Sequence, residues 1–240
     1  KTPLTAIFAY LDILKDLDKN LTEDQKKGFD AVKRNSDQLK GIINNILEIS
    51  RIEAGKFELI ITQINPLEKI KNTLANLKPL VERKGLKFEM DVDRNITKME
   101  TDEQRFEEIM NNLISNAIKF TEKGSITIRA EKKGDYAQFS VSDTGVGVPE
   151  DKISQLFQKF YQVDASISRK FGGTGLGLSI TKQLIELQGG KICQYHHSFG
   201  RRSLSTLRIG RSQNPARYRS GAYLQARHTL LRTHESQLPD

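Results

Sequence analysis

The chain has 240 residues, enough for one or two domains with a substantial core, and a formal net charge of +8. Its single cysteine, Cys193, excludes an internal disulfide framework and is compatible with a reducing, cytoplasmic setting. No apolar run is long enough to cross a membrane. Residues 191–240 carry seven of the eight net charges, so the rest of the chain has no basic footprint for nucleic acid. We therefore expect neither nucleic-acid binding nor membrane contact within this chain.

The first 54 residues predict two helices joined by a short turn. Apolar residues recur at helical spacing between Leu4 and Leu17. Thr22 and Gln25 have the spacing of a capping box that opens a second helix, and Gly55 is placed to end it. Two helices cannot bury such seams alone, so we predict a homodimeric four-helix bundle built from two hairpins, with a hairpin packed on its own domain as the alternative. The heptad seam of the second helix consists of Phe29, Val32, Ser36, Leu39, Ile43, Ile46 and Ser50.

From Lys56 onwards, strands and helices alternate, which predicts a two-layer α/β sandwich and an α+β fold class for the whole chain. The domain boundary falls near Gly55, which gives a helical hairpin over 1–54, a second domain over 55–192 and a tail over 193–240. The expected strands are 57–64, 86–92, 125–131 and 136–142, and the expected helices are 66–84, 102–120 and 181–188.

The predicted helix over 102–120 has an apolar face and a polar face. Glu108, Asn112, Asn116 and Lys119 gather on the polar face when each residue is turned by about 100°. Asparagines at i and i+4 present amide oxygens suited to Mg²⁺, and a lysine one turn later can meet phosphate charge. A solvated polar face is the alternative, although asparagine is a poor helix former and two in line call for a reason.

Two glycine-rich stretches follow this helix. In the first, Asp143 stands at the end of a predicted strand, where it can accept a hydrogen bond from an exocyclic amine, and Gly145 and Gly147 leave space for a flat base. In the second, FGGTGLGLSI over 171–180, glycines run into a helix and allow close approach to phosphate. Each stretch taken alone is equally well explained as a plain turn, and Phe157 and Phe160 between them as core aromatics.

In this order, the motifs resemble the catalytic core of sensor histidine kinases, whose ATP-binding domain shares its fold with gyrase, mismatch-repair and heat-shock chaperone ATPases. The resemblance covers residues 1 to about 192. The matching motifs are the N box over 112–116 with Lys119 and Phe120, the first glycine box over 143–147, the F box over 157–160 and the second glycine box over 173–178.

The resemblance implies ATP and Mg²⁺ as cofactors and assigns roles by position. Asn112 would coordinate Mg²⁺, Asn116 and Lys119 would contact the phosphates, and Asp143 would hold the adenine amine. Glu108 would assist proton transfer from a histidine. Residues 149–172 would form a mobile ATP lid. The remaining residues implied in nucleotide binding are Phe120, Gly145, Gly147, Phe157, Phe160, Arg169, Gly173, Thr174, Gly175, Leu176, Gly177 and Leu178.

The start of the chain, Lys1-Thr2-Pro3-Leu4, resembles the end of the family's H box, H-E-x-[KR]-T-P. The phosphoacceptor histidine is then expected three residues before Lys1, and Thr2 where family members orient the water that removes phosphate. None of the four histidines present can replace the acceptor by position. We therefore expect a piece of a longer protein, and a membrane or sensor segment upstream is compatible with it.

The function implied is an ATP-dependent protein histidine kinase of a two-component system, with a response-regulator receiver domain as partner. A degenerate module that binds ATP and dimerises without phosphotransfer is the alternative. An ATP-hydrolysing relative of gyrase or the chaperones is disfavoured by the H-box remnant and the heptad helices.

The tail after Ile192 does not follow the family pattern of two further strands and a glycine-containing turn. It lacks sustained alternation and is strongly basic. We interpret it as a basic appendage or, preferably, an out-of-frame product, and such runs are usually disordered. On this interpretation the closing strands are missing, which would expose a sheet edge and lower stability.

Overall fold

The computed structural model describes residues 7, 9–10, 13–14, 21–93, 96–134, 136–163, 173–196 and 203–210. The chain divides into two compact units, Lys1–Ala54 and Gly55–Asp240. Among the helices in these described ranges, none combines the length and the apolar character needed to cross a membrane.

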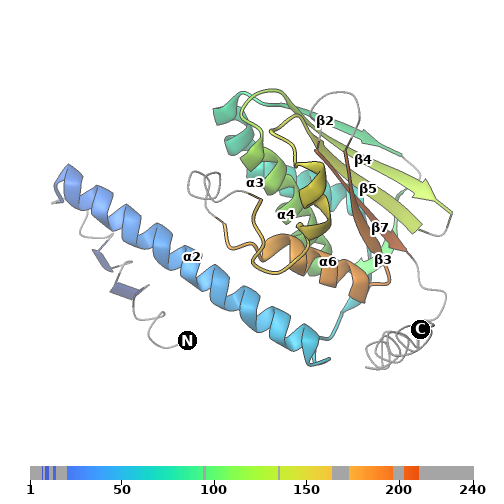
Figure 1. The fold of residues 1–240 in the computed structure, drawn as a ribbon, viewed down its shortest axis with the longest axis horizontal. Coiled ribbons are helices and arrows are strands. Elements are labelled where there is room, and N and C mark those ends of the chain that lie inside the picture. The colour runs from blue at the N-terminus through green and yellow to red at the C-terminus, as the bar shows by residue number, and fades with distance from the viewer. Residues whose placement is uncertain are drawn as a thin grey trace, which may run out of the picture. The chain divides into compact units, whose positions relative to one another are not determined.

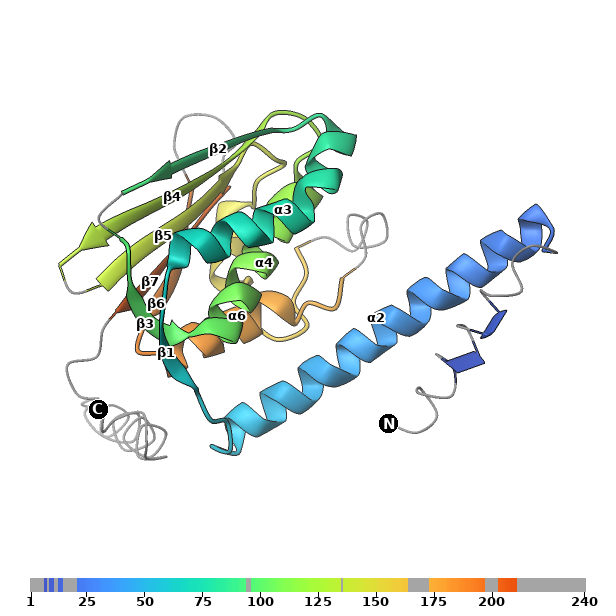
Figure 2. The ribbon, with the colours of Figure 1, turned by 180° about the vertical axis from the view of Figure 1, so that it is seen from behind.

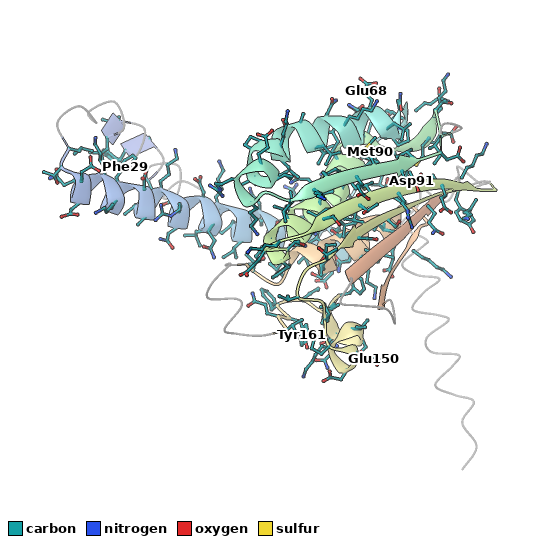
Figure 3. All side chains as sticks on the ribbon, turned by 90° about the horizontal axis from the view of Figure 1, so that it is seen from above. Phe29, Glu68, Met90, Asp91, Glu150 and Tyr161 are labelled. Carbon is teal, nitrogen blue, oxygen red and sulfur yellow. The ribbon has the colours of Figure 1, made fainter. Side chains whose placement is uncertain are left out.

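The described part of the first unit consists mainly of one long helix, α2 (Glu23–Glu53). Its capping box forms as the sequence predicts: Thr22 Oγ1 accepts a hydrogen bond from Gln25 N, and the Gln25 side chain accepts one from Thr22 N at 2.8 Å. Gly55 follows the C-cap with a φ of 65°, a conformation typical of the residue that ends a helix. Most of the predicted seam is solvent-exposed in the single chain. Phe29, the first residue of this seam, is labelled on α2 in Figure 3. The exposed apolar seam residues are Val32, Leu39, Ile43 and Ile46.

The second unit is built on a five-stranded sheet in the order β2-β4-β5-β7-β6 (Figure 1). β2 and β4 are parallel, and every other neighbouring pair is antiparallel. Ile126, Ile128, Phe139 and Val141 alternate along the central strands and are buried. The bounds are β2 (Lys87–Val92), β4 (Ser125–Lys133), β5 (Tyr136–Asp143), β6 (Lys191–His196) and β7 (Ser203–Gly210).

Three helices cover one face of this sheet, as Figures 1 and 2 show from opposite sides: α3 (Pro66–Lys84), α4 (Glu103–Phe120) and α6 (Gly177–Leu187). α4 packs between the other two, and Phe106 meets Phe139 of β5 edge-to-face with ring centroids 5.2 Å apart. The caps explain the helix bounds. Asn65 caps α3 ahead of a proline at its start, and Asp102 Oδ1 caps α4 by accepting from Arg105 N at 3.0 Å.

A two-stranded antiparallel sheet joins the start of this unit to α4. It pairs β1 (Ile61–Ile64) with β3 (Met99–Asp102). Asp102 is buried, and its second oxygen accepts a hydrogen bond from Ile60 N at 2.8 Å. Gln188, buried at the end of α6, accepts from Asp102 N at 3.1 Å. The beginning of α4 and the end of α6 are thus fixed to each other.

The structure corrects one expectation about the C-terminal part. The closing strands are not missing after Ile192, because β6 and β7 continue the sheet to Gly210. β7 pairs with β5 from Tyr136↔Gly210 to Asp143↔Ser203, so β5 is an interior strand and not an exposed edge. These strands are not evident in the sequence because their apolar residues do not alternate regularly. Backbone pairing with β5 and with each other, which requires no such alternation, holds them in the sheet. Residues 211–240 lie outside the described part of the chain.

Other differences are smaller. β1 begins at Ile61 and not at residue 57, and α6 begins at Gly177, four residues before the expected start. β3 was not expected, since it is four residues long and contains a single large apolar residue, Met99. Helix α3 has the predicted bounds, and α4 begins one residue after the expected start.

Candidate active site

The polar face expected on α4 exists in the fold. Asn112, Asn116 and Lys119 are half-buried, while the apolar residues between them, such as Leu113 and Ala117, are in the core. Asn116 Nδ2 donates to Asn112 Oδ1 at 3.4 Å, so the two asparagines one turn apart contact each other. Because these three side chains are half-buried, the polar face of α4 is not the fully solvated face that was the alternative interpretation.

Asn112 lies against the start of α6. Its Nδ2 donates to Thr181 Oγ1 at 2.7 Å. A Cβ atom added to Gly177 would lie 2.6 Å from Asn112 Oδ1, so the Asn112 side chain would have to move to accommodate it. The glycine therefore keeps the space beside this amide oxygen open. An uncharged oxygen donor beside a glycine loop and a helix start fits the hard oxygen ligation that Mg²⁺ requires.

Lys119 brings a positive charge to the same glycine loop. Its Nζ would lie 3.1 Å from a Cβ at Gly173 and is 5.0 Å from the centre of the Phe120 ring. Burial lowers the pKa of Lys119. A partly desolvated ammonium interacts with phosphate more strongly than one on the open surface, because the local dielectric constant is lower.

Asp143 ends β5 and is buried. Burial raises the pKa of its carboxyl group, while the backbone N–H of Gly145 and the side chain of Thr121 act in the opposite direction. Gly145 N donates to Asp143 Oδ1 at 2.9 Å, and a Cβ at Gly145 would lie 2.5 Å from the carbonyl oxygen of Phe120. The turn after β5 is thus packed against the end of α4, with one carboxylate oxygen engaged by the turn itself.

The segment after this turn begins with the short helix η2 (Glu150–Gln155) and continues through the F box to Tyr161. Glu150 and Tyr161 are labelled in Figure 3. Phe160 has a φ of 61°, which is uncommon for a residue with a side chain, and its ring is exposed. A Cβ at Gly175 would lie 2.6 Å from the carbonyl carbon of Phe160. Gln162 Nε2 donates to the carbonyl oxygen of Gly173 at 3.0 Å. The F-box segment and the second glycine stretch are therefore in direct contact.

Glu108, one turn before Asn112, is bound by Arg105. Arg105 Nη1 donates to Glu108 Oε2 at 2.7 Å, and the guanidinium lies 4.9 Å from the centre of the Phe57 ring. The carboxylate is thus held on the same helix as the two asparagines.

The remaining predicted residues have simpler settings. Thr174 Oγ1 accepts from Leu176 N at 3.2 Å, and Leu176 is fully buried at the N-cap of α6. The half-buried Phe157 ring lies 6.0 Å from Lys182 Nζ. Gly147 has a φ of 71°, and Leu178 is half-buried on α6. Thr2 and Arg169 lie outside the described residues.

Sequence reasoning missed two residues that support this site. Thr181 contacts Asn112 across 69 positions of the chain, and no local pattern marks it. Lys84, in the last turn of α3, donates to the carbonyl oxygens of Ile118 at 2.6 Å, Lys119 at 3.0 Å and Thr121 at 3.0 Å. It thereby satisfies the carbonyl groups at the end of α4, which a helix leaves without partners of its own.

Family comparison agrees with this architecture. Residues 101–213 match the family described as histidine kinase-, DNA gyrase B- and HSP90-like ATPase, a span that reaches beyond β7. Residues 1–55 match the His Kinase A (phospho-acceptor) domain. The second unit therefore contains an ATP-binding domain of this ATPase class, and the helical unit before it matches the His Kinase A domain.

Similar curated proteins are histidine kinases. The circadian input-output histidine kinase CikA of Synechococcus elongatus is 40% identical over 216 residues, 87% of this chain and 28% of that protein. Sensor histidine kinase GacS of Pseudomonas protegens is 40% identical over 198 residues, 80% of this chain and 21% of that protein. Sensor histidine kinase RcsC of Escherichia coli is 36% identical over 197 residues, 80% of this chain and 20% of that protein. The chain spans less than a third of each of these relatives.

Solved structures lead to the same class. Full-length ShkA in complex with AMPPNP superposes with a TM-score of 0.76 at 26% identity, over 90% of this chain and 45% of that one. The nucleotide-free catalytic domain of histidine kinase ThkA superposes with a TM-score of 0.57 at 27% identity, over 63% of this chain and 96% of that one. The chain belongs to the sensor histidine kinase family and represents its catalytic core.

Proposed function

We propose that the protein to which this chain belongs transfers the γ-phosphoryl group of ATP to a histidine expected just before Lys1, at the start of the helical hairpin, in the same or the partner subunit, and then to an aspartate of a response regulator. One observation carries the proposal: an amide oxygen (Asn112) and an ammonium group (Lys119) face one glycine loop at Gly177 and Gly173. That loop leads into a helix start, the arrangement that binds phosphate groups.

Each group has a role in this reaction. Asp143 would accept a hydrogen bond from the adenine amine, and the N–H of Gly145 would keep the carboxylate in place. Lys119 and Asn116 would bind the phosphate oxygens, and Asn112 would supply an oxygen ligand to Mg²⁺. When bound, Mg²⁺ neutralises charge on the transferred phosphoryl group.

Glu108, oriented by Arg105, would assist removal of the proton from the attacking imidazole. The contact between Gly175 and Phe160 would allow the segment over 149–172 to respond to nucleotide as a lid. Thr2 would orient the water that removes phosphate, and Arg169 would contribute to nucleotide binding.

Two partners follow from this proposal. A second copy of the chain would cover the exposed seam of α2, where Leu39, Ile43 and Ile46 lie in the single chain. A response regulator would dock on the resulting bundle. A structure of ThkA in complex with response regulator TrrA superposes with a TM-score of 0.64 at 23% identity and supports a fold compatible with such docking. The catalytic portion would work in the cytoplasm, where ATP is available.

Labelling with ATP tests the proposal. A version extended upstream of Lys1 by a segment that completes the His-Glu motif is incubated with Mg²⁺ and ATP labelled at the γ-position. We expect an acid-labile, alkali-stable label that disappears when the added histidine is replaced by alanine. ATP binding without any label would favour the degenerate module. Phosphate release that persists without the histidine would favour the ATP-hydrolysing alternative.

A further inference from the structure

Thr181 is a buried hydroxyl residue at the face of α6 that meets α4. It is 2% exposed, and its Oγ1 accepts the 2.7 Å hydrogen bond from Asn112 Nδ2. Because an amide NH₂ group can only donate, the hydroxyl oxygen must be the acceptor here. A hydroxyl could also donate to an amide oxygen, but an amide turned by half a turn would place its nitrogen against Asn116 Nδ2, which is itself a donor. The two hydrogen bonds together therefore set which end of the Asn112 amide points at α6.

The two ends of that amide differ in chemistry. The oxygen has lone pairs that a cation can use, whereas the nitrogen has none to offer. With Nδ2 engaged by Thr181, Oδ1 faces Gly177: a Cβ there would lie 2.6 Å from Oδ1 and 3.2 Å from Nδ2. The other contact of Oδ1, with Asn116 Nδ2, is long at 3.4 Å and too weak to fix the amide by itself.

We infer that Thr181 is a positioning residue, whose hydroxyl holds the Asn112 amide with its oxygen towards the glycine loop and so sets the Mg²⁺ affinity of the nucleotide complex. This inference rests on the proposed function, in which Asn112 supplies a ligand to Mg²⁺. Without the hydroxyl, the amide is free to rotate by half a turn and present its nitrogen instead. Groups that orient metal ligands in this way typically change metal affinity by about 10- to 100-fold.

Substitution of Thr181 separates orientation from packing. Thr181→Val keeps the shape and removes the acceptor, whereas Thr181→Ser keeps the acceptor. Thr73→Val is the matched control, because Thr73 is also a buried helical threonine, but its hydroxyl donates to the carbonyl oxygen of Lys69 on α3. The affinity of AMPPNP is measured by titration calorimetry, once with a series of Mg²⁺ concentrations and once with EDTA.

The wild type, Thr181→Ser and Thr73→Val should all gain affinity with Mg²⁺. Thr181→Val should show about a tenfold smaller gain, with affinity in EDTA within about twofold of the wild type and an unchanged circular dichroism spectrum. A full Mg²⁺ gain in Thr181→Val, or an equal loss with Mg²⁺ and with EDTA, would overturn the inference. A wild type that gains nothing from Mg²⁺ would instead overturn the proposed magnesium site, and the inference with it.

Discussion

Arg105 donates a 2.7 Å hydrogen bond to Glu108 from three positions earlier on α4. The Arg105 guanidinium packs over the Phe57 ring, so the group that binds the Glu108 carboxylate is itself fixed in place. Glu107, the neighbour of Glu108, instead forms an ion pair with Lys69 of α3 at 3.2 Å. Two adjacent glutamates on one helix thus have different partners. Glu107 can therefore serve as the control for substitutions of Glu108.

Glu108→Gln should slow phosphoryl transfer by about 100-fold, because a positioned acid–base group contributes roughly that much or more. Nucleotide affinity should remain within about twofold of the wild type. The rate of label incorporation in the extended version measures the effect, and Glu107→Gln is the control. Equal losses in both variants would argue that charge at the start of α4, and not proton transfer, is responsible.

Gly175→Ala should abolish ATP binding. Gly175 has a φ of 71°, and its new Cβ would lie 2.6 Å from the backbone of Phe160. Gly134→Ala provides the control, since Gly134 has a φ of 62° but no atom within 4 Å of the added carbon. Both variants suffer backbone strain of about 1 kcal/mol, but only the first has the clash. Unchanged affinity in Gly175→Ala, measured by calorimetry, would contradict the role of the loop.

The sequence predicts best what local chemistry determines. The ends of α3 follow from Asn65 and Gly85, and the start of α2 from Thr22, because a cap is set by neighbouring residues. The polar face of α4 is also local, since one helix carries Asn112, Asn116 and Lys119.

What the sequence could not predict depends on distant partners. β6 and β7 are held by pairing with each other and with β5, so their own composition says little. The orientation of the Asn112 amide depends on Thr181, and the end of α4 depends on Lys84 of α3. Such contacts follow only from the tertiary arrangement of α3, α4 and α6.

Nucleotide affinity should depend on the ionisation of Asp143. Burial raises the pKa of this carboxyl group above its ordinary value of 3.8. Oδ1 already accepts a hydrogen bond from Gly145 N, which leaves Oδ2 as the acceptor for the adenine amine. Protonation would turn Oδ2 into a donor, so affinity should fall as the pH is lowered through the raised pKa. Stability should change in the opposite sense: the folded state binds the proton more tightly, so this group favours folding below pH 3.8 and loses that contribution as the pH rises through the raised pKa.

Titration calorimetry between pH 4 and pH 8 measures this dependence, with Asp143→Asn as the comparison. The variant should bind more weakly near neutral pH and lack the acid-side decline. An identical decline in both proteins would assign the titration to another group, such as the nucleotide phosphates.

Lys84→Met should lower the free energy of unfolding by about 1–2 kcal/mol, because three carbonyl groups at the end of α4 lose a charged donor. Lys78→Met, which removes only an exposed ion pair with Glu82 on the same helix, should change it by less than about 0.5 kcal/mol. Urea unfolding measures both. Similar values for the two variants would show that Lys84 does not act as a cap.

Ile43→Asp should convert a dimer into a monomer. Ile43 lies in the heptad seam of α2 and is 37% exposed in the single chain, and a charge there would be buried by a second copy. Asn44→Asp adds the same charge at the next position, away from the seam, and should leave the dimer intact. Analytical ultracentrifugation over a range of concentrations distinguishes the two. A wild-type monomer at all concentrations would refute the proposed assembly.

The placement of β7 inside the sheet constrains how the domain folds during synthesis. Asp143 pairs with Ser203, so β7, the neighbour of β5 on the side away from β4, emerges from the ribosome only after α6 and β6 have been made. All the described residues of the proposed site, from Glu108 to Leu178, are therefore translated before the scaffold can close. Pairing at such separation is slow because the chain entropy must be lost before the contact forms. Nucleotide binding during translation should consequently begin late, at about the length at which Gly210 leaves the exit tunnel.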